Sequence, residues 1–356
     1  MQDVYNTLIL GASYGSLLAT KLLLAGHNVT LVCLPEEAAT IDRNGARVQF
    51  PVKGRETPVE VDSRTLAGKL SAITPDTADP SRYDLVCLAM QEPQYGAAGV
   101  RALLDAIAKA RKPCMSIMNM PPLTYLRRIP GLDVEKLRSS YTEPSVWRNF
   151  EPGLMTLCSP DPQAFRPDPK EINFLKVTLP TNFKAARFAD EAPTAMLRRM
   201  QADIEAARYD MDGVRIELPV KLKVHDSVFV PLAKWAMLIC GNYRCVQKDA
   251  ARSIRDAVHT DLAASRGVYD WVRELCIALG ASPDDLVPFE KYANAALSLS
   301  RPSSAARALF AGAPHIERVD RLVQGIAAQK GMRSAILDET VALVDARLAL
   351  SQKIPA

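Results

Sequence analysis

A single lysine stands in an otherwise apolar segment of the chain, Val230-Pro-Leu-Ala-Lys-Trp-Ala-Met-Leu-Ile-Cys240. Because burying an ammonium group is costly unless the group has a partner or a task, Lys234 is a candidate proton donor or ligand-holding residue. Pro231, three residues earlier, is typical of the start of a helix. The alternative is a lysine whose stem packs on the surface while its ammonium reaches water.

Other polar residues could act with this lysine. Asn119 follows a strand-like segment, and open parallel sheets bind ligands at the carboxyl ends of their strands, although an Asn before Met-Pro-Pro also suits a turn. Asn242 follows Lys234 on the same predicted helix, about 80° around from it. His225, or similarly His315, could serve as an acid or base and Arg244 as a carboxylate clamp, whereas a lone histidine is more often structural.

The segment Gly11-Ala-Ser-Tyr-Gly-Ser16 lies between two apolar runs. This frame is typical of a βαβ unit that binds dinucleotides, but one residue of the usual G-x-G-x-x-G fingerprint is missing. Gly11 suits the tight turn, Gly15 suits close packing of helix on strand, and Ser16 suits a helix N-cap. We predict that this helix N-terminus binds the cofactor phosphates, and a tight turn without a ligand is the alternative. The predicted cofactor-binding residues are Gly11, Ala12, Ser13, Tyr14, Gly15 and Ser16.

Strand-like and helical segments alternate in the first half of the chain, which predicts a parallel, doubly wound sheet. The predicted strands are Tyr5–Leu10, Asn28–Cys33, Asp84–Ala89 and Pro113–Met118. The predicted helices are Ser16–Gly26 and Ala97–Lys112. A small antiparallel excursion is predicted from the short segments Arg47–Phe50, Pro58–Asp62 and Lys69–Ile73. Further strands that extend the sheet are predicted at Met155–Cys158, Asn173–Leu179 and Phe183–Phe188, followed by an amphipathic helix at Ala195–Tyr209.

Beyond about residue 218 the pattern predicts helices throughout. They are Val230–Arg244, Thr260–Leu279, Phe289–Leu297, Ser303–Phe310, Ile316–Gln329 and Asp338–Leu350. An α/β region followed by a run of helices indicates two domains. We therefore predict a Rossmann-type, dinucleotide-binding domain over residues 1–217 and a helical domain for substrate binding and dimerisation over residues 218–356.

The composition of the 356 residues, 48% hydrophobic with a formal net charge of +4, is ordinary for a globular protein and disfavours a nucleic-acid partner. No apolar run is long enough to span a membrane, and no signal peptide precedes the first strand, so we expect a cytoplasmic protein. The seven cysteines form no CxxC pair and no Cys/His cluster. They predict buried, reduced thiols and no metal site.

The stretch GASYGSLLATKLLLAGHNVTLVC, residues 11–33, resembles the opening of the ketopantoate reductases (2-dehydropantoate 2-reductases). The resemblance continues in Tyr83–Met90, Met115–Asn119, Leu232–Met237, Arg301–Ser304 and Val319–Gly325. It implies a Rossmann-type domain and an all-helical C-terminal domain of the 6-phosphogluconate dehydrogenase type. It also implies reduction of a small 2-oxo acid with a nicotinamide hydride, with NADP or NAD as the cofactor, and a homodimer.

The resemblance further implies roles for individual residues. Lys234 matches the proton donor of the family, Asn119 an Asn that contacts substrate or nicotinamide, and Asn242 an Asn that contacts substrate. Ser303 or Ser304 matches the Ser that binds the substrate carboxylate, although Arg-Pro-Ser-Ser also suits a helix N-cap.

Several positions depart from the family pattern, so this is a divergent member. Gln91, which we place among the cofactor-binding residues, stands where the family carries a lysine, and Leu238 stands where it carries a second Asn. The family's acidic residue falls on Val319, with Glu317 close by. The arginine that many relatives use for the NADP 2′-phosphate falls on Leu34, and the acids that follow it would suit a ribose diol.

These features favour an NAD(P)H-dependent reductase of a small 2-oxo acid other than ketopantoate, with substrate in the cleft between the domains. A first alternative is an opine-type dehydrogenase that reduces an imine with His225 as the acid. A second alternative is a nucleotide-binding sensor that uses a reductase scaffold without chemistry.

Overall fold

The computed structural model describes residues 3–352 and divides into two compact units. The first unit comprises the described residues of Met1–Met90, together with Gln94–Met118 and Val146–Asp226. The second unit comprises Gln91–Pro93, Asn119–Ser145 and the described residues of Ser227–Ala356. The division of the chain into domains 1–217 and 218–356 stays a prediction.

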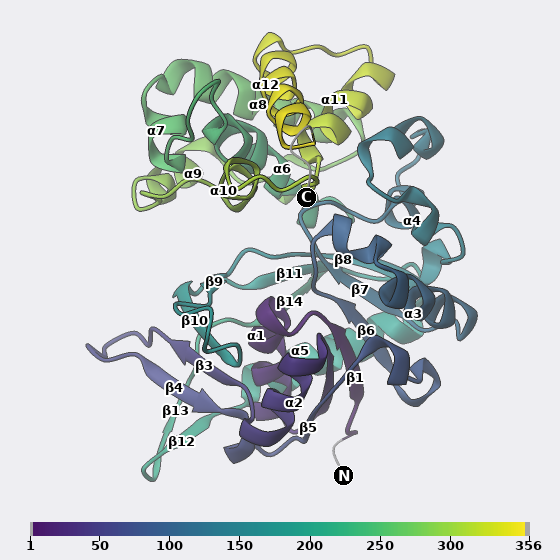
Figure 1. Cartoon of the computed structure of the whole chain (residues 1–356), viewed down its shortest axis with the longest axis vertical. Helices are drawn as coiled ribbons and strands as arrows, with labels where there is room; N and C mark the ends of the chain where they lie inside the picture. The colour runs from purple at the N-terminus through teal and green to yellow at the C-terminus, as the bar shows by residue number, and fades with distance from the viewer. Residues whose placement is uncertain (1–2, 353–356) are drawn as a thin grey trace. The chain divides into compact units, whose positions relative to one another are not determined.

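An eight-stranded sheet forms the centre of the first unit (Figure 1). Its strand order is β14-β11-β8-β7-β6-β1-β2-β5, in which neighbours from β8 to β5 are parallel. The chain runs outward from β1 through β2 to β5 and then returns to β6 on the other side of β1, which is the reversal of a doubly wound fold. The α/β fold class and the four predicted parallel strands are therefore confirmed. The strands are β1 (Asn6–Leu10), β2 (Asn28–Val32), β5 (Leu70–Ile73), β6 (Leu85–Leu88), β7 (Cys114–Ile117), β8 (Met155–Ser159), β11 (Phe183–Ala186) and β14 (Leu222–His225).

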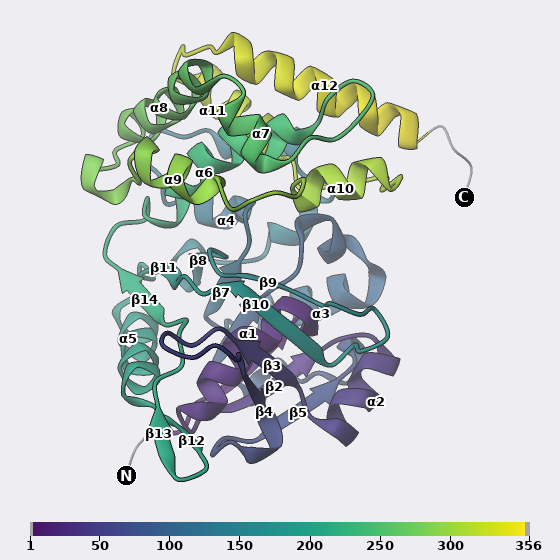
Figure 2. The same ribbon diagram turned by 90° about the vertical axis from the view of Figure 1, so that its left-hand side faces the viewer.

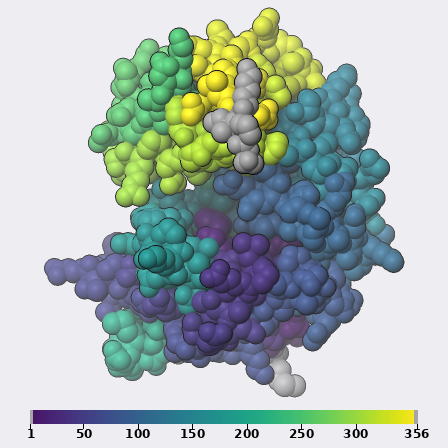
Figure 3. All heavy atoms as spheres, in the orientation of Figure 1, coloured from purple at the N-terminus to yellow at the C-terminus, as the bar shows by residue number. Residues whose placement is uncertain are grey.

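A second, four-stranded sheet in the same unit has the order β4-β3-β10-β9. Its strands are β3 (Arg47–Phe50), β4 (Val59–Asp62), β9 (Gln163–Phe165) and β10 (Phe174–Leu179), and the β3–β4 hairpin protrudes from the first unit (Figure 3). Two expectations are thereby corrected. Residues 69–73 belong to the main sheet, where β5 pairs in parallel with β2, and residues 173–179 pair with β3 instead of extending the main sheet. The residue pattern of a short strand does not specify which strand it pairs with.

The helices of the first unit are α1 (Ala12–Leu24), α2 (Pro35–Asn44), α3 (Ala98–Lys109) and α5 (Glu191–Ala206). Three of them were predicted, and α2 was not. Pro35 occupies the first position of α2, and Glu36 and Glu37 lie in its first turn, where a fixed φ and negative charge both stabilise a helix N-terminus. A short hairpin, β12 (Tyr209–Met211) and β13 (Val214–Ile216), and the strand β14 follow α5. Because β14 lies in the main sheet, the prediction of helices throughout beyond residue 218 is wrong.

Helix α1 contacts strands of both sheets, which explains why it is apolar on nearly every side. Lys21 is the exception, because its side chain is charged and yet only 1% exposed. Its Nζ donates to the carbonyl oxygens of Leu218 and Pro219 at 3.0 Å each. The next residue, Val220, adopts a φ of 66°, which is strained for a β-branched side chain. Lys21 thus fastens the segment that leads into β14.

The burial of Lys21 predicts an alkaline rise in stability. Burial, together with the nearby Lys221, lowers the pKa of Lys21 from 10.5 to about 7. Between these two values the unfolded chain binds more protons than the folded protein, so the free energy of unfolding should rise with pH. The difference in unfolding free energy between the wild type and Lys21→Met, measured with urea from pH 7 to 9.5, should therefore increase steadily. The exposed Lys109→Met is the control, and a difference that stays constant with pH would contradict this role of Lys21.

The second unit is built from helices, as predicted. They are α4 (Leu123–Leu126), α6 (Lys234–Met237), α7 (Ile254–His259), α8 (Leu262–Ala278), α9 (Phe289–Ala296), α10 (Ser304–Phe310), α11 (Val319–Gln329) and α12 (Ala335–Ser351). The long α12 packs against α10 and α11 (Figure 2). Short 3₁₀ turns, among them Val134–Ser140, connect and cover these helices.

Over residues 3–352 no helix has the length and apolar character that crossing a membrane requires. In the same range no three His, Cys, Asp or Glu side chains group as metal ligands would. All seven cysteines are free thiols, and six of them are buried.

Candidate functional site

A small cavity in the second unit brings together residues that lie far apart in the chain. Its volume of about 20 Å³ has room for one water molecule. The residues with polar groups in the lining are Gln91, Asn119, Asn242, Tyr243, Ser304 and Glu317, and apolar walls come from Leu238, Ala305 and Ile316. Three residues predicted for the site, Gln91, Asn119 and Asn242, are therefore neighbours in the structure.

The helical segment from Pro231 to Cys245 is irregular. It begins as a 3₁₀ turn, continues as α6 from Lys234, widens into a π-helical turn over Leu238–Asn242 and ends as a 3₁₀ turn. A π turn accommodates an extra residue, and such turns are frequent at functional sites. The angle of about 80° between Lys234 and Asn242, which assumes a regular α-helix, therefore does not apply. Asn242, at the end of the wide turn, lines the cavity.

Glu317 is the acidic group of the cavity. Its Oε1 accepts from the backbone N–H of Glu92 at 3.3 Å, and its Oε2 accepts from Nδ2 of Asn119 at 3.4 Å. Burial raises the pKa of Glu317 to about 7, and the charge of Lys234 acts in the opposite direction. A carboxyl group with this pKa can exchange a proton or change its hydrogen-bonding role near neutral pH.

The carbonyl end of the Asn119 side chain is available to a ligand. Its Nδ2 is bonded to Glu317, but its buried Oδ1 has no hydrogen-bond partner within residues 3–352. A buried acceptor without a donor is costly, so a water or ligand donor is expected there. The amide of Asn242 likewise makes no hydrogen bond to any side chain or backbone group that the structure describes.

Neighbouring contacts fix the positions of these groups. The Tyr243 hydroxyl donates to the carbonyl oxygen of Glu317 and accepts from the N–H of Val319 at 3.0 Å, which holds the segment that carries Glu317. Ser303 donates to the carbonyl oxygen of Asn242 at 2.7 Å and caps α10 through the N–H of Ala306. The N-cap interpretation of Arg-Pro-Ser-Ser is thus confirmed for Ser303, and Ser304 is the serine that lines the cavity.

Lys234 is half-buried at the start of α6, and it lies close enough for its charge to lower the pKa of Glu317. It is not part of the cavity lining. The structure therefore places the predicted proton donor in the electrostatic surroundings of Glu317, within the same unit.

Three other candidates lie elsewhere. His225 belongs to β14 of the first unit, so the structure does not group it with the cavity residues. Arg244 donates to the carbonyl oxygen of Cys240 and to the Ser265 hydroxyl, and it serves to hold helices together. His315 is exposed and does not line the cavity.

The predicted cofactor loop lies at the carboxyl end of β1 in the first unit. Gly11 has a φ of 101°, and a Cβ there would lie 2.7 Å from the Met90 side chain and 2.8 Å from the Ala89 oxygen. At Gly15 a Cβ would lie 2.7 Å from Ile9, so only glycine permits this close packing of α1 on β1. The helix begins directly at Ala12, and the N-cap role predicted for Ser16 is wrong, because the Ser16 hydroxyl donates to the Ala12 carbonyl inside the helix.

This helix N-terminus fits the phosphates of a dinucleotide. No side chain caps α1 and no acidic residue lies in its first turn, so the N–H groups there are not used by the helix itself. Ser13 is exposed, while Tyr14 packs edge-on against Phe183 and donates to the Pro162 carbonyl at 2.6 Å. The turn also follows β1, which has β2 on one side and β6 on the other. The chain changes direction across the sheet at this strand, and doubly wound sheets bind their ligands at such a point.

An ion pair that the sequence analysis did not anticipate lies near the end of β2. Leu34, where many relatives carry an arginine, is 73% exposed. Glu37, in the first turn of α2, is paired with Arg166, which follows β9 and is 129 residues away in sequence. Both charges act on the thiol of Cys33, whose pKa burial raises to about 12, so the pair lies close to the carboxyl end of β2.

No protein-family model matches the chain, and no curated protein sequence matches it either. Solved structures do match over nearly the whole length. A 2-dehydropantoate 2-reductase from Methylococcus capsulatus has a TM-score of 0.65 at 15% identity, with 98% of each chain covered. D-mandelate dehydrogenase, solved with NADH and anilino(oxo)acetate, has a TM-score of 0.63 at 12% identity, with 98% of this chain and 99% of the other covered.

A ketopantoate reductase from Staphylococcus aureus, described as dimeric, has a TM-score of 0.57 at 8% identity, with 97% of this chain and 99% of the other covered. At these identities the likeness concerns the fold alone. The chain therefore has the fold of the ketopantoate reductases, the fold that its sequence resemblance implied.

Proposed function

We propose that the protein is an NAD(P)H-dependent reductase that converts a small 2-oxo acid into the 2-hydroxy acid. The observation that carries this proposal is the group formed by Glu317 and Asn119 beside the charge of Lys234, with an unused buried acceptor on Asn119. Such a group offers a cation, a titratable acid and amide groups to a polar substrate. The solved reductases of the same fold support the choice of reaction class.

In this proposal a bound nicotinamide supplies the hydride, and the residues of the second unit supply the rest. The Lys234 ammonium protonates or orients the carbonyl oxygen as negative charge develops on it. The Asn242 amide and the Ser304 hydroxyl donate to the substrate carboxylate. Ionised Glu317 accepts from the hydroxyl group of the product, while Asn119 accepts from a donor of substrate or cofactor. Because the cavity has room only for water, its side chains must move to admit the substrate.

The substrate proposed is not ketopantoate. Gln91 and Leu238 stand where the family carries a lysine and an asparagine, and both line the cavity. The loss of a cation and of an amide changes the groups that a substrate can meet. D-mandelate dehydrogenase was solved with an aryl-substituted oxo acid, so aryl 2-oxo acids belong among the candidates.

The first test of the proposal is direct titration with NADPH and NADH, followed through nicotinamide fluorescence. We expect at least one of them to bind, because the N-terminus of α1 is uncapped. Oxidation of the bound cofactor is then measured with a panel of pyruvate, 2-oxoisovalerate, phenylglyoxylate and ketopantoate. If neither cofactor binds at millimolar concentration, the proposed reductase function is wrong. Binding without turnover over a wide panel of oxo acids and imines would favour a sensor.

We also propose that Arg166 decides the choice of cofactor. Its guanidinium lies beside Glu37 near the end of β2, where the adenine ribose of a dinucleotide is held in this fold. In Arg166→Gln the uncompensated Glu37 would repel a 2′-phosphate and accept from a ribose diol. We expect the Kd for NADPH, divided by the Kd for NADH, to rise by about tenfold or more. A tenfold change in affinity is about what the loss of one charge-assisted hydrogen bond causes.

Arg64→Gln is the matched control, because Arg64 is a paired arginine of the same unit, bonded to Asp62. It should leave both dissociation constants unchanged. An unchanged ratio in Arg166→Gln, with normal binding of both cofactors, would contradict the role of Arg166 without affecting the reductase proposal. The homodimer and the cytoplasmic location remain predictions, the first supported by the dimeric reductase of the same fold.

A further inference from the structure

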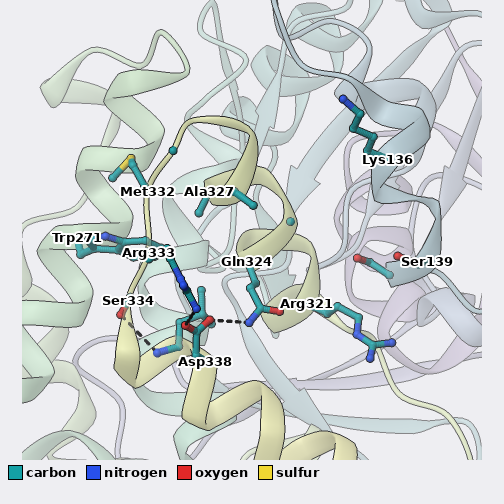
Figure 4. Close-up of a pocket in the computed structure, with 15 residues that line it drawn as sticks. Lys136, Ser139, Trp271, Arg321, Gln324, Ala327, Met332, Arg333, Ser334 and Asp338 are labelled. Carbon is teal, nitrogen blue, oxygen red and sulfur yellow. Dashed lines mark hydrogen bonds and ion pairs between the residues drawn. The ribbon is translucent and has the colours of Figure 1, made fainter.

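A much larger cavity lies elsewhere in the second unit (Figure 4). Its volume is about 750 Å³, within the range of pockets that bind small molecules. No residue of its lining is shared with the cavity that contains Asn119. It is bounded by the turn Val134–Ser140, by α11, by the start of α12 and by Trp271 of α8. The proposed reductase chemistry therefore makes no use of this space.

The floor of this cavity is made of small residues. Gly325, Ala327 and Ala328 lie on α11, and Gly331 follows that helix. None of these side chains is larger than a methyl group, so they leave room for a flat molecule, above all at the exposed Ala328 and Gly331, because Ala327 is 2% exposed and a Cβ at Gly325 would lie 3.1 Å from Leu137. Figure 4 shows Ala327 between Trp271 with Met332 on one side and Lys136 on the other.

The rim of the cavity carries more positive than negative charge. Lys136, Arg321 and Arg333 contribute cations, which pair with Asp133, Asp345 and Asp338 respectively, and of these three acids only Asp338 belongs to the lining. Asp338 is already occupied, because it accepts from Nε2 of Gln324 at 2.7 Å and pairs with Arg333 at 3.3 Å (Figure 4). Two of the three acids thus lie outside the lining, so that the lining itself carries three cations and one acid, a balance that favours an anionic ligand.

Two polar groups of the lining are not used by the protein. Ser140 is 4% exposed, and its hydroxyl makes no hydrogen bond to any group of residues 3–352. Within the same residues the indole N–H of Trp271 donates to no acceptor, although the ring is only half-buried. Both residues line the cavity, so a ligand bound there can use the hydroxyl and the indole N–H as hydrogen-bond donors.

We infer that this cavity is a second ligand site, for a flat, aromatic anion. The ring would lie on the small residues of α11 against Trp271, and the anionic group would meet Lys136 and the hydroxyl of Ser140. The ring position uses stacking, and the anion position uses charge-assisted hydrogen bonds. A neutral ring or a bare anion satisfies only one half of the site.

Phenyl phosphate is the probe for the first experiment, with phenol and inorganic phosphate as its two halves. Titration calorimetry on the full chain should show saturable binding of phenyl phosphate. The Kd values of phenol and of inorganic phosphate should each be at least about tenfold higher. Trp271 provides an independent signal, because Trp147 and Trp235 are buried at 1% and 0% exposure. Binding should change the tryptophan emission, and Trp271→Phe should abolish that change.

Lys136→Gln tests the anion position without risk to the fold, because Lys136 is 72% exposed and pairs only with Asp133 at the surface. It should weaken phenyl phosphate by about fivefold or more, whereas the exposed Lys291→Gln on α9 should not. Equal binding to wild type and Lys136→Gln would overturn the inference, since the anion would then lie elsewhere, for example at the N-terminus of α1. Absence of saturable binding would overturn it as well. Neither result depends on reductase activity.

Discussion

Replacing Lys234 with alanine is expected to lower kcat for the 2-oxo acid by a factor of about 10² to 10⁴, the usual contribution of a positioned general acid. The affinity for NADPH or NADH should stay nearly unchanged, because the predicted phosphate-binding turn belongs to the first unit. The value of kcat should fall because Lys234 is the cation whose charge acts on Glu317. Alanine can neither donate a proton to the carbonyl oxygen nor stabilise the negative charge that develops on it. Steady-state kinetics and fluorescence titration measure the two quantities separately.

Two further variants sharpen this test. Lys234→Arg keeps the positive charge, but a guanidinium does not give up its proton near neutral pH. The KM of Lys234→Arg should therefore lie closer to the wild-type KM than that of Lys234→Ala does, while kcat should stay nearly as low as in Lys234→Ala. Lys291→Ala, a change of an exposed lysine in the same unit, should behave as the wild type. If Lys234→Ala keeps turnover within about tenfold, or roughly 1.4 kcal/mol of barrier, Lys234 is not the proton donor.

The second large effect concerns pH and Glu317. Burial raises the pKa of this carboxyl group to about 7, so it is mostly neutral at pH 6 and mostly ionised at pH 8. An ionised Glu317 repels the carboxylate of an incoming 2-oxo acid, and the KM of the wild type should therefore increase by about tenfold from pH 6 to pH 8. In Glu317→Gln the amide stays neutral, and this increase should disappear. The measurement is the KM at half-unit steps of pH for both proteins.

The charged and titratable groups around Glu317 also bear on this result. Glu92, Lys234, Tyr141 and Tyr243 all lie close enough to interact with its charge. The pKa of Glu92 is itself raised by burial, so Glu92→Gln is the matched control and should shift the midpoint of the profile without flattening it. A profile in Glu317→Gln that equals the wild-type profile would assign the titration to another group.

The sequence predicted the sheet well because its central strands are almost entirely apolar and alternate with segments of helical periodicity. It failed where that signal is short or ambiguous. The strand β5 reads Leu-Ser-Ala-Ile, a mixed pattern that predicts a strand but not whether β2 or β4 is its neighbour. The helix α2 carries few apolar residues, only Ala38 and Ile41 being buried, so its periodicity gave no signal. Its capping features at Pro35 were present and would have indicated it.

The candidate site was predictable only in part, for a related reason. Asn119 and Gln91 follow the carboxyl ends of β7 and β6 in the chain. Because open parallel sheets bind ligands at the carboxyl ends of their strands, these positions pointed to a site. Glu317 lies in a connecting segment just before α11, where no spacing distinguishes a buried acid from a solvated one. The family resemblance pointed two residues away, to Val319, which is fully buried and apolar. Arg166 was not foreseen because its ion pair links segments 129 residues apart.

The π-helical turn at Leu238–Asn242 makes the site tolerant of a change in chain length at one point. Such a turn holds one more residue than an α-helix would, so deletion of a single residue there would let the segment close into a regular helix. Because a π turn and an α turn each complete about one rotation, the residues on both sides of the deletion would keep their directions about the axis. A deletion within a regular helix such as α8 would instead rotate every later position of that helix by about 100°. Tyr243 would thus keep its bond to the segment of Glu317, and the cavity would lose only the group of the deleted residue.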